Sequence, residues 1–316
     1  MNYNEFLLEI QRLVQEKQGG GFDIKVQRVI KNNDTMLDGL AICKQEEVFA
    51  PTIYLNSYFE DLKKGMEMQD IVSHIIGAYQ QNDNISLSSV KELVDFRNIK
   101  NRVVYKLINK ETNMELLKGI PYLEFLDLAI VFYLIIEENN NGQMTALIHN
   151  EHMISWKTTT EELYQLAKQN SPELLPAQIK TMREVMEEML KQNVGDICDG
   201  GLVDELLGEE RVPLYVLSNS RQVNGDSCIL YDNCLKKFAA EQGADIIILP
   251  SSVHEMLLMP ERESVSYEEL SAMVTEINQN EVSEEDRLSN QIYRYSLSSE
   301  KVEIAFRSEK YLIGGV

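Results

Sequence analysis

The segment "LAIVFYLIIEENNNGQMTALIHNEHMISW" (residues 128–156) carries the clearest structural signal in this chain. Its first nine residues are apolar and rich in β-branched and aromatic side chains, which is typical of a buried strand. The sequence "ENNNGQ" (138–143) then supplies residues that favour tight turns. A second apolar run follows over 144–148. The segment therefore predicts a β-hairpin that leads into the surroundings of Trp156, the only tryptophan, which we expect to anchor the junction between this hairpin and the next helix.

Two other segments predict hairpins by the same criteria. Residues 22–44 alternate well enough for two strands around a turn at 31–35, and residues 212–231 predict two strands around Asn224-Gly225. A helix over 232–243 and a strand over 245–250 follow the second of these. Hairpin and helix thus recur three times, but the copies share too little sequence to form a repeat.

Helical periodicity fills most of the remaining sequence. The first helix is predicted over residues 1–17, with its apolar side formed by Phe6, Leu7, Ile10, Leu13 and Val14. Further helices are predicted over 68–82, over most of 87–125, over 158–193 with Thr159 or Thr160 as the cap, and after Pro260.

These elements predict an α+β fold with a helical N-terminal half that contains one hairpin, and a C-terminal half of β-hairpins and helices. A chain of 316 residues exceeds the usual size of one domain. We expect a mainly helical subdomain over 1–125, a hairpin-helix subdomain over 126–275, and an acidic tail over 276–316 that is partly disordered or forms an edge strand.

The charge balance limits the partners. Thirty Lys and Arg face 51 Asp and Glu, so the net charge is -21, and this surface repels phosphate backbones. Nucleic acid is therefore disfavoured as a partner, whereas a basic protein partner suits this acidic surface. The longest apolar segment, 122–138, contains Glu124 and Asp127 and is too polar for a membrane span. The N-terminus has no basic leader, which predicts a cytoplasmic protein.

The cysteines predict neither a zinc site nor a disulfide framework. They lie far apart without a Cys-x-x-Cys pair, so we expect reduced thiols: Cys43, Cys198, Cys228 and Cys234. Cys234 starts a predicted helix, where the thiol pKa is lowered, although a small buried hydrophobe is the preferred description of Cys228 and Cys234. No phosphate-binding loop is present, and no cofactor is predicted.

His254-Glu255 lies in "LPSSVHEMLLMP" (249–260) and resembles the start of a zinc-binding His-Glu-x-x-His helix, but Leu258 replaces the second histidine. A strand precedes the pair and "EMLLMP" can form a second strand, so we expect a strand-turn-strand junction. We favour a structural role in which Ser251, Ser252 and His254 satisfy turn amides. The alternative is a catalytic site formed by His254, Glu255, Ser251 and Ser252, although no Gly-x-Ser-x-Gly elbow surrounds any serine.

Two further groups are candidates for binding. His149, Glu151 and His152 are possible metal ligands, but on an extended chain residues three apart point to opposite faces, and we favour a turn-surface role. The spacing of Arg102, Lys106 and Lys110 predicts a basic stripe on a helix. This stripe binds an acidic partner or pairs with the protein's own carboxylates, and we favour internal pairing.

Several phrases together resemble a domain-of-unknown-function family of anaerobic gut Firmicutes: "FRNIKNRVVYKLIN", "PYLEFLDLAIVFYLIIE", "ALIHNEHMISW", "LYVLSNS" with "NGDSCILYDNCLKKFA", and "IILPSSVHEMLLMP". They occur in this order. "HMISWKTTTEELYQLAKQNS" is locally similar to the uncharacterised YtpQ-like family. The resemblance implies a bacterial cytoplasmic protein and assigns no catalytic residue.

The sequence thus favours a non-enzymatic cytoplasmic protein that acts through protein-protein contacts. A hydrolase or metal-dependent enzyme with a site around His254 and Glu255 is the alternative hypothesis.

Overall fold

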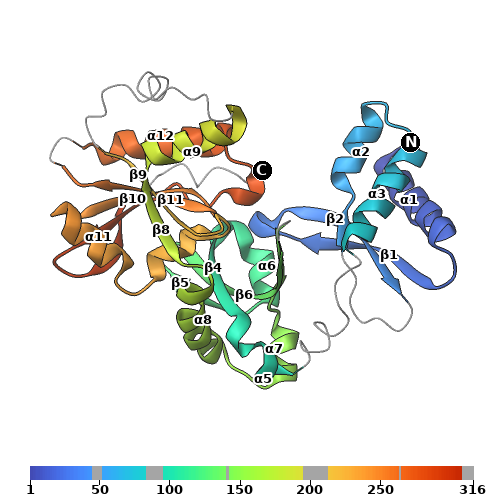
Figure 1. Ribbon diagram of the computed structural model, residues 1–316, viewed down its shortest axis with the longest axis horizontal. Coiled ribbons are helices and arrows are strands. Elements are labelled where there is room, and N and C mark those ends of the chain that lie inside the picture. The colour runs from blue at the N-terminus through green and yellow to red at the C-terminus, as the bar shows by residue number, and fades with distance from the viewer. Residues whose placement is uncertain (45–51, 83–94, 140–141, 195–212, 263–264, 308–316) are drawn as a thin grey trace. The chain divides into compact units, whose positions relative to one another are not determined.

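A computed structural model describes residues 1–44, 52–82, 95–139, 142–194, 213–262 and 265–307. The fold mixes helices and antiparallel sheets, so the predicted α+β class is confirmed. The chain forms two compact units, Met1–Ile99 and Lys100–Val316 (Figure 1). No described helix is long and apolar enough to cross a membrane.

The N-terminal unit packs helices against a small antiparallel sheet. Its sheet has the order β1-β2-β3 (Phe22–Ile30, Met36–Lys44, Thr52–Tyr54), and its helices are α1, α2 and α3 (Tyr3–Gln18, Asn56–Lys63, Met68–Asn82). The hairpin predicted over 22–44 is confirmed, with the short helix η1 (Asn32–Asp34) at its turn. Phe6, Ile10 and Val14 of α1 are fully buried, and Leu7 and Leu13 pack beside them, which confirms the predicted apolar side.

The C-terminal unit contains two sheets, and the first is organised around one long strand. β6 (Leu128–Asn139) pairs with β7 (Gly142–Leu147), which confirms the hairpin predicted over 128–148. β4 (Val103–Asn109) pairs with residues 128–134 of β6, and β5 (Tyr122–Phe125) pairs with residues 128–131. Because β4 occupies one edge of β6, β5 and β7 follow each other along the opposite edge.

The second sheet has six strands in the order β13-β12-β10-β11-β9-β8. Their bounds are Lys301–Phe306, Ile292–Ser296, Ile246–Ser252, Glu255–Pro260, Tyr215–Asn219 and Ala177–Thr181. All pairs are antiparallel. Residues from 276 onward, where the sequence predicts an acidic tail, thus supply two strands of this sheet, and β13 lies at its edge.

Helices complete the unit (Figure 1). α8 packs on β4, α9 on β8 and β9, α11 beside η4, and α12 on β10, β12 and β13. The bounds of these and the shorter helices are η2 Lys100–Arg102, η3 Glu111–Asn113, α6 Met114–Gly119, α7 Asn150–Trp156, α8 Thr160–Leu174, α9 Met182–Val194, η4 Gly225–Leu230, α11 Cys234–Gln242, α12 Tyr267–Asn280 and η5 Glu284–Asp286. The short helix α5 (Phe96–Ile99) ends the N-terminal unit.

Three secondary-structure predictions are wrong. Residues 103–109 form β4 instead of a helix, because this segment is buried on both faces and its β-branched and aromatic side chains suit a central strand. Residues 177–181 form β8, although 158–193 was predicted to be helical. The second strand predicted within 212–231 is the short helix η4, whose residues contact β9 and β4.

The two sheets of the C-terminal unit are joined by polar contacts to Asp127, in the turn between β5 and β6. Ser289 Oγ donates to its carboxylate at 2.6 Å, and the hydroxyl of Tyr293 on β12 donates to it at 2.8 Å. The sequence boundary predicted between residues 125 and 126 falls in this same turn. Asp127 therefore ties the β5–β6 turn to the six-stranded sheet.

Candidate interaction surface

Helix α12 has one buried face and one exposed face. Ser266 caps its N-terminus, because its Oγ accepts the amide of Glu269 at 3.3 Å. Val274 and the partly buried Leu270 pack into a core with Ile247, Leu249, Met259 and Ile292 of the sheet. This spacing of four residues places both leucine and valine on the sheet side of the helix.

Buried polar side chains fix the second half of α12. Asn278, which is 2% exposed, donates from Nδ2 to the carbonyl of Ser289 at 3.0 Å and to Oδ1 of Asn290 at 2.7 Å. These bonds reach the loop before β12. They determine the rotation of α12 about its own axis, so the side chains on the outer face have a defined position.

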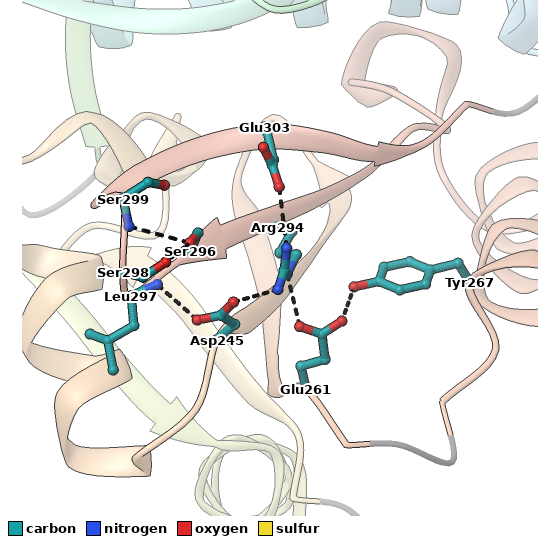
Figure 2. A network of polar contacts seen from close by, with 9 residues as sticks. All are labelled: Asp245, Glu261, Tyr267, Arg294, Ser296, Leu297, Ser298, Ser299 and Glu303. Atoms are coloured by element: carbon teal, nitrogen blue, oxygen red, sulfur yellow. Dashed lines mark hydrogen bonds and ion pairs between the residues drawn. The ribbon is translucent and has the colours of Figure 1, made fainter.

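A network around Arg294 fixes the beginning of the same helix (Figure 2). Arg294 on β12 contacts Asp245 at 2.5 Å through Nη2, Glu261 at 2.8 Å through Nε, and Glu303 at 3.3 Å through Nη1. The hydroxyl of Tyr267, the first residue of α12, donates to the other oxygen of Glu261 at 2.5 Å. The Arg294 guanidinium thus connects β12 to β13 through Glu303, to the start of β10 through Asp245, and to the end of β11 through Glu261. Glu261 in turn connects it to α12 through Tyr267.

The carboxylate of Asp245 completes the network on its other side. Its Oδ1 accepts the backbone amide of Leu297 at 2.8 Å, so it fixes the turn that leads from β12 to β13. Burial and the bond to Glu261 raise the pKa of Tyr267, which keeps this hydroxyl protonated and able to donate.

The outer face of α12 exposes an apolar pair among carboxylates. Met273 is 42% exposed and Ile277 is 41% exposed. Because they are four residues apart, they are neighbours on one side of the helix, and Glu269 and Glu281 continue the same line at its two ends. Glu276 lies next to Met273 on the helix surface, three residues further along α12. These three glutamates are exposed, and none has a salt bridge to a residue that the structure describes.

His254 lies in the turn between β10 and β11, which confirms the predicted strand-turn-strand junction. Its Nε2 is 3.2 Å from Oδ1 of Asp286, and its Nδ1 accepts the amide of Asn224 at 3.4 Å. Its carbonyl accepts Ser218 Oγ at 2.7 Å and the amide of Gly225 at 3.2 Å. Both ring nitrogens are occupied, so neither is free to activate a nucleophile.

The other candidates near His254 also form local bonds. Ser252 Oγ accepts the amide of His254 at 3.1 Å, and Ser251 Oγ donates to Glu255 Oε1 at 3.3 Å. Ser251, Ser252 and Glu255 therefore lie together at this hairpin, but these hydrogen bonds do not reach the His254 ring. The arrangement suits a braced turn more than a nucleophile and its base.

The three possible metal ligands at the start of α7 do not converge. His149 precedes the helix, and its amide donates to Nδ1 of His152 at 3.0 Å, so this nitrogen is occupied. His152 stacks on Trp156 with ring centroids 5.2 Å apart. Burial lowers the pKa of His152, and the electrostatic effect of His149 lowers it further. Among the residues with a described position, no group of three His, Cys, Asp or Glu could hold a metal ion.

Arg102, Lys106 and Lys110 do not share a helical face, because Lys106 is in β4 and the other two flank that strand. Arg102 donates to the carbonyl of Ile136 at 3.2 Å, and Lys110 forms a 2.6 Å salt bridge with Glu124. Two of these cations therefore bond within the unit.

Cys228 lies in η4, and Cys234 begins α11. Burial raises the pKa of Cys234 to about 11 and raises that of Cys228 further. The lowered pKa expected for Cys234 from its place at a helix start is therefore wrong, because desolvation outweighs the helix effect. Cys234 lines an open hollow of about 330 Å³ with Lys168, Asp232 and Lys237. Cys198 lies outside the described residues.

The sequence alone does not identify the α12 surface. Glu269, Met273, Ile277 and Glu281 follow each other at intervals of four residues in the sequence. A stripe with this spacing is also typical of a buried helix face. Only the packing of Leu270 and Val274 against the sheet shows which of these neighbouring stripes is buried and which is exposed. The Arg294 network could not be predicted, because its members are far apart in the sequence.

Comparison with known proteins identifies a matching family. A family model described as a family of unknown function (DUF5688) matches residues 3–297. No curated protein and no solved structure is detectably similar to the chain.

Proposed function

The chain belongs to the DUF5688 family, whose function is unknown, and we propose that it is a non-enzymatic bacterial protein that acts in the cytoplasm by contacting another protein. The observation that carries this proposal is the exposed pair Met273 and Ile277 on α12. Adjacent apolar side chains on a helix that is fixed at both ends form a surface that loses little entropy when a partner covers it.

The position of this pair supports contact with a protein. Elsewhere on the C-terminal unit, Ile154 is 78% exposed and Met114 is 64% exposed, and single exposed apolar side chains of this kind are normal on protein surfaces. Met273 and Ile277 differ because they are neighbours on one rigid helix. Contacts of this type, spaced by one turn, are the usual anchors of helix-mediated recognition.

A hydrolase or metal-dependent enzyme centred on His254 and Glu255 is the less favoured proposal. The His254–Asp286 pair resembles the histidine and orienting carboxylate of a hydrolase, but its second ring nitrogen faces the backbone amide of Asn224 instead of a hydroxyl. The geometry supports a turn brace better than a reacting pair.

Photo-crosslinking tests the proposed function. A photoreactive amino acid is placed at Met273 and, separately, at Ile154, and each full-length chain is irradiated in cells of its natural host. We expect one defined protein adduct from position 273 and none from position 154. If position 273 gives no adduct, or if both positions give the same mixture, the proposed function is wrong.

A further inference from the structure

We propose that the outer face of α12 binds a cationic amphipathic helix of a partner protein, an inference that rests on the proposed function and adds the chemistry of the partner. Met273 and Ile277 would pack against the partner's apolar side chains. Glu269, Glu276 and Glu281 would pair with its Lys or Arg side chains.

The carboxylates determine the charge of this partner. Glu269 and Glu281 lie at the two ends of the apolar pair, and Glu276 lies beside it. Some exposed carboxylates of the unit are already paired, as Glu124 is with Lys110 and Glu300 is with Lys236. The three on α12 have no such cation among the described residues, so a cationic partner gains electrostatic energy there without breaking existing pairs.

The dimensions of the surface fit a helix. Glu281, which follows the last residue of α12, lies twelve positions after Glu269, and this separation corresponds to roughly 18 Å along the helix axis. A partner helix of three to four turns spans about this length, and its apolar residues at spacings of three and four can contact Met273 and Ile277 together.

A second copy of the same chain fits this face poorly. Contact between two α12 faces would bring glutamates of one copy against glutamates of the other, in molecules that each carry a net charge of -21. Like charges across an interface disfavour association. The charge pattern therefore selects a partner of opposite charge.

The rigidity of α12 supports specific recognition. Its first residue is fixed through Glu261 to Arg294, and its second half is fixed through Asn278 to the loop before β12. The outer side chains therefore do not have to be ordered at the moment of binding, which lowers the entropic cost of association.

Fluorescence anisotropy with a defined probe tests this inference. The probe is a labelled 18-residue peptide of leucine and lysine in amphipathic helical order, and it is titrated with the full-length chain at low and at physiological salt. Two variants alter the surface, namely Met273→Gln/Ile277→Gln and Glu276→Lys/Glu281→Lys. We expect each to weaken peptide binding by about tenfold or more, and binding of the unaltered chain to weaken as salt rises.

A matched control separates this surface from bulk charge. Glu173→Lys/Glu241→Lys changes the net charge equally at two other exposed glutamates of the same unit. We expect this control to weaken binding by less than about threefold. Circular dichroism and thermal unfolding establish that all variants are folded.

The outcomes separate this inference from the proposed function. If the peptide fails to bind, if both charge variants weaken it equally, or if the α12 variants bind it normally, the cationic-helix inference is wrong. Self-association of the chain that the Met273→Gln/Ile277→Gln variant abolishes, measured by sedimentation, would also overturn it. In each case a defined adduct from position 273 would still support the proposed function, whereas its absence would contradict that function directly.

Discussion

Nη2 of Arg294 lies 2.5 Å from Oδ2 of Asp245, and both side chains are mostly buried, with 33% and 21% of their surface exposed. Asp245 precedes β10, whereas Arg294 is in β12. The contact therefore joins segments 49 residues apart at the end of the six-stranded sheet. Through Glu261 the same guanidinium reaches Tyr267, so the stability of this end of the sheet and the position of α12 depend on one side chain.

Replacing Arg294 by glutamine is expected to lower the free energy of unfolding by about 2 kcal/mol, because it leaves three carboxylates without their cation. Urea denaturation measures this loss. Arg12→Gln is the control: Arg12 also contacts two carboxylates, Glu9 and Glu16, but it is 51% exposed in a helix of the N-terminal unit. Its substitution should cost much less. Equal effects of the two substitutions would contradict the bracing role of Arg294.

Local patterns predicted much of this fold where burial affects only one face of an element. The hairpin over 22–44 and the helix over 68–82 follow their apolar periodicity, since each has one face toward a core. The hairpin over 128–148 was predicted from its turn residues and its β-branched and aromatic run, although residues 128–134 of β6 are buried on both faces. β4 was misread because its residues are buried on both faces, and then neither a period of two nor of 3.6 distinguishes strand from helix. Its identity depends on pairing with β6, which is a long-range contact.

The candidate surface was less predictable than the fold. The sequence drew attention to His254, whose neighbours Asp286 and Asn224 are 30 residues or more away and occupy its ring. The exposure of the α12 stripe is not predictable from the sequence, because it depends on which helix face meets the sheet. Which residues surround a side chain, and which helix face is exposed, are decided by tertiary packing. Charge and periodicity therefore suggest a kind of partner more readily than a place where it would bind.

Gly225 is predicted to be intolerant of any side chain. A methyl group at this position would overlap Ser218 Oγ and the carbonyl oxygen of His254, and it would lie 2.9 Å from the amide nitrogen of Asn219. Because backbone atoms must move, Gly225→Ala should lower the free energy of unfolding by about 2 kcal/mol or more.

Gly77→Ala is the matched control for this prediction. Gly77 is inside α3, and a methyl group there would meet nothing within 4 Å. Alanine has the higher helix propensity, so this change should stabilise the chain by about 0.5 to 1 kcal/mol. Thermal unfolding of both variants tests the pair, and a neutral Gly225→Ala would show that η4 is not packed tightly against the β10–β11 turn.

Asp226 is predicted to make stability decrease as pH rises. It is fully buried, one of its carboxylate oxygens has no hydrogen-bond partner among the described residues, and burial raises its pKa well above the ordinary value. Above about pH 3.9 the unfolded chain releases this proton while the folded chain retains it. The unfolded state is then favoured, and stability falls until pH reaches the folded-state pKa.

Asp226→Asn tests this pH dependence, because asparagine keeps the shape but has no proton to lose. Between pH 5 and pH 8 the variant should gain stability relative to the unaltered chain by up to about 1.4 kcal/mol per pH unit. Asp232→Asn, at a side chain that is 71% exposed, is the control and should leave the slope unchanged. A constant difference between Asp226→Asn and the unaltered chain across this range would exclude a retained proton on Asp226.

His254 is predicted to stabilise the β10–β11 turn. Its Nε2 lies 3.2 Å from Oδ1 of Asp286 and its Nδ1 accepts the amide of Asn224, so both ring nitrogens contact residues that hold this turn. His254→Ala should lower the free energy of unfolding by about 1 kcal/mol, a modest value because the ring is 41% exposed. Asp286→Asn should weaken the same contact. In a double-mutant cycle the two changes should therefore cost less together than the sum of their separate effects.

A reacting histidine would behave differently, since its loss would leave the melting temperature nearly unchanged and abolish a measurable activity. Additive effects in the cycle, together with an unchanged melting temperature for His254→Ala, would therefore favour the hydrolase hypothesis over the brace.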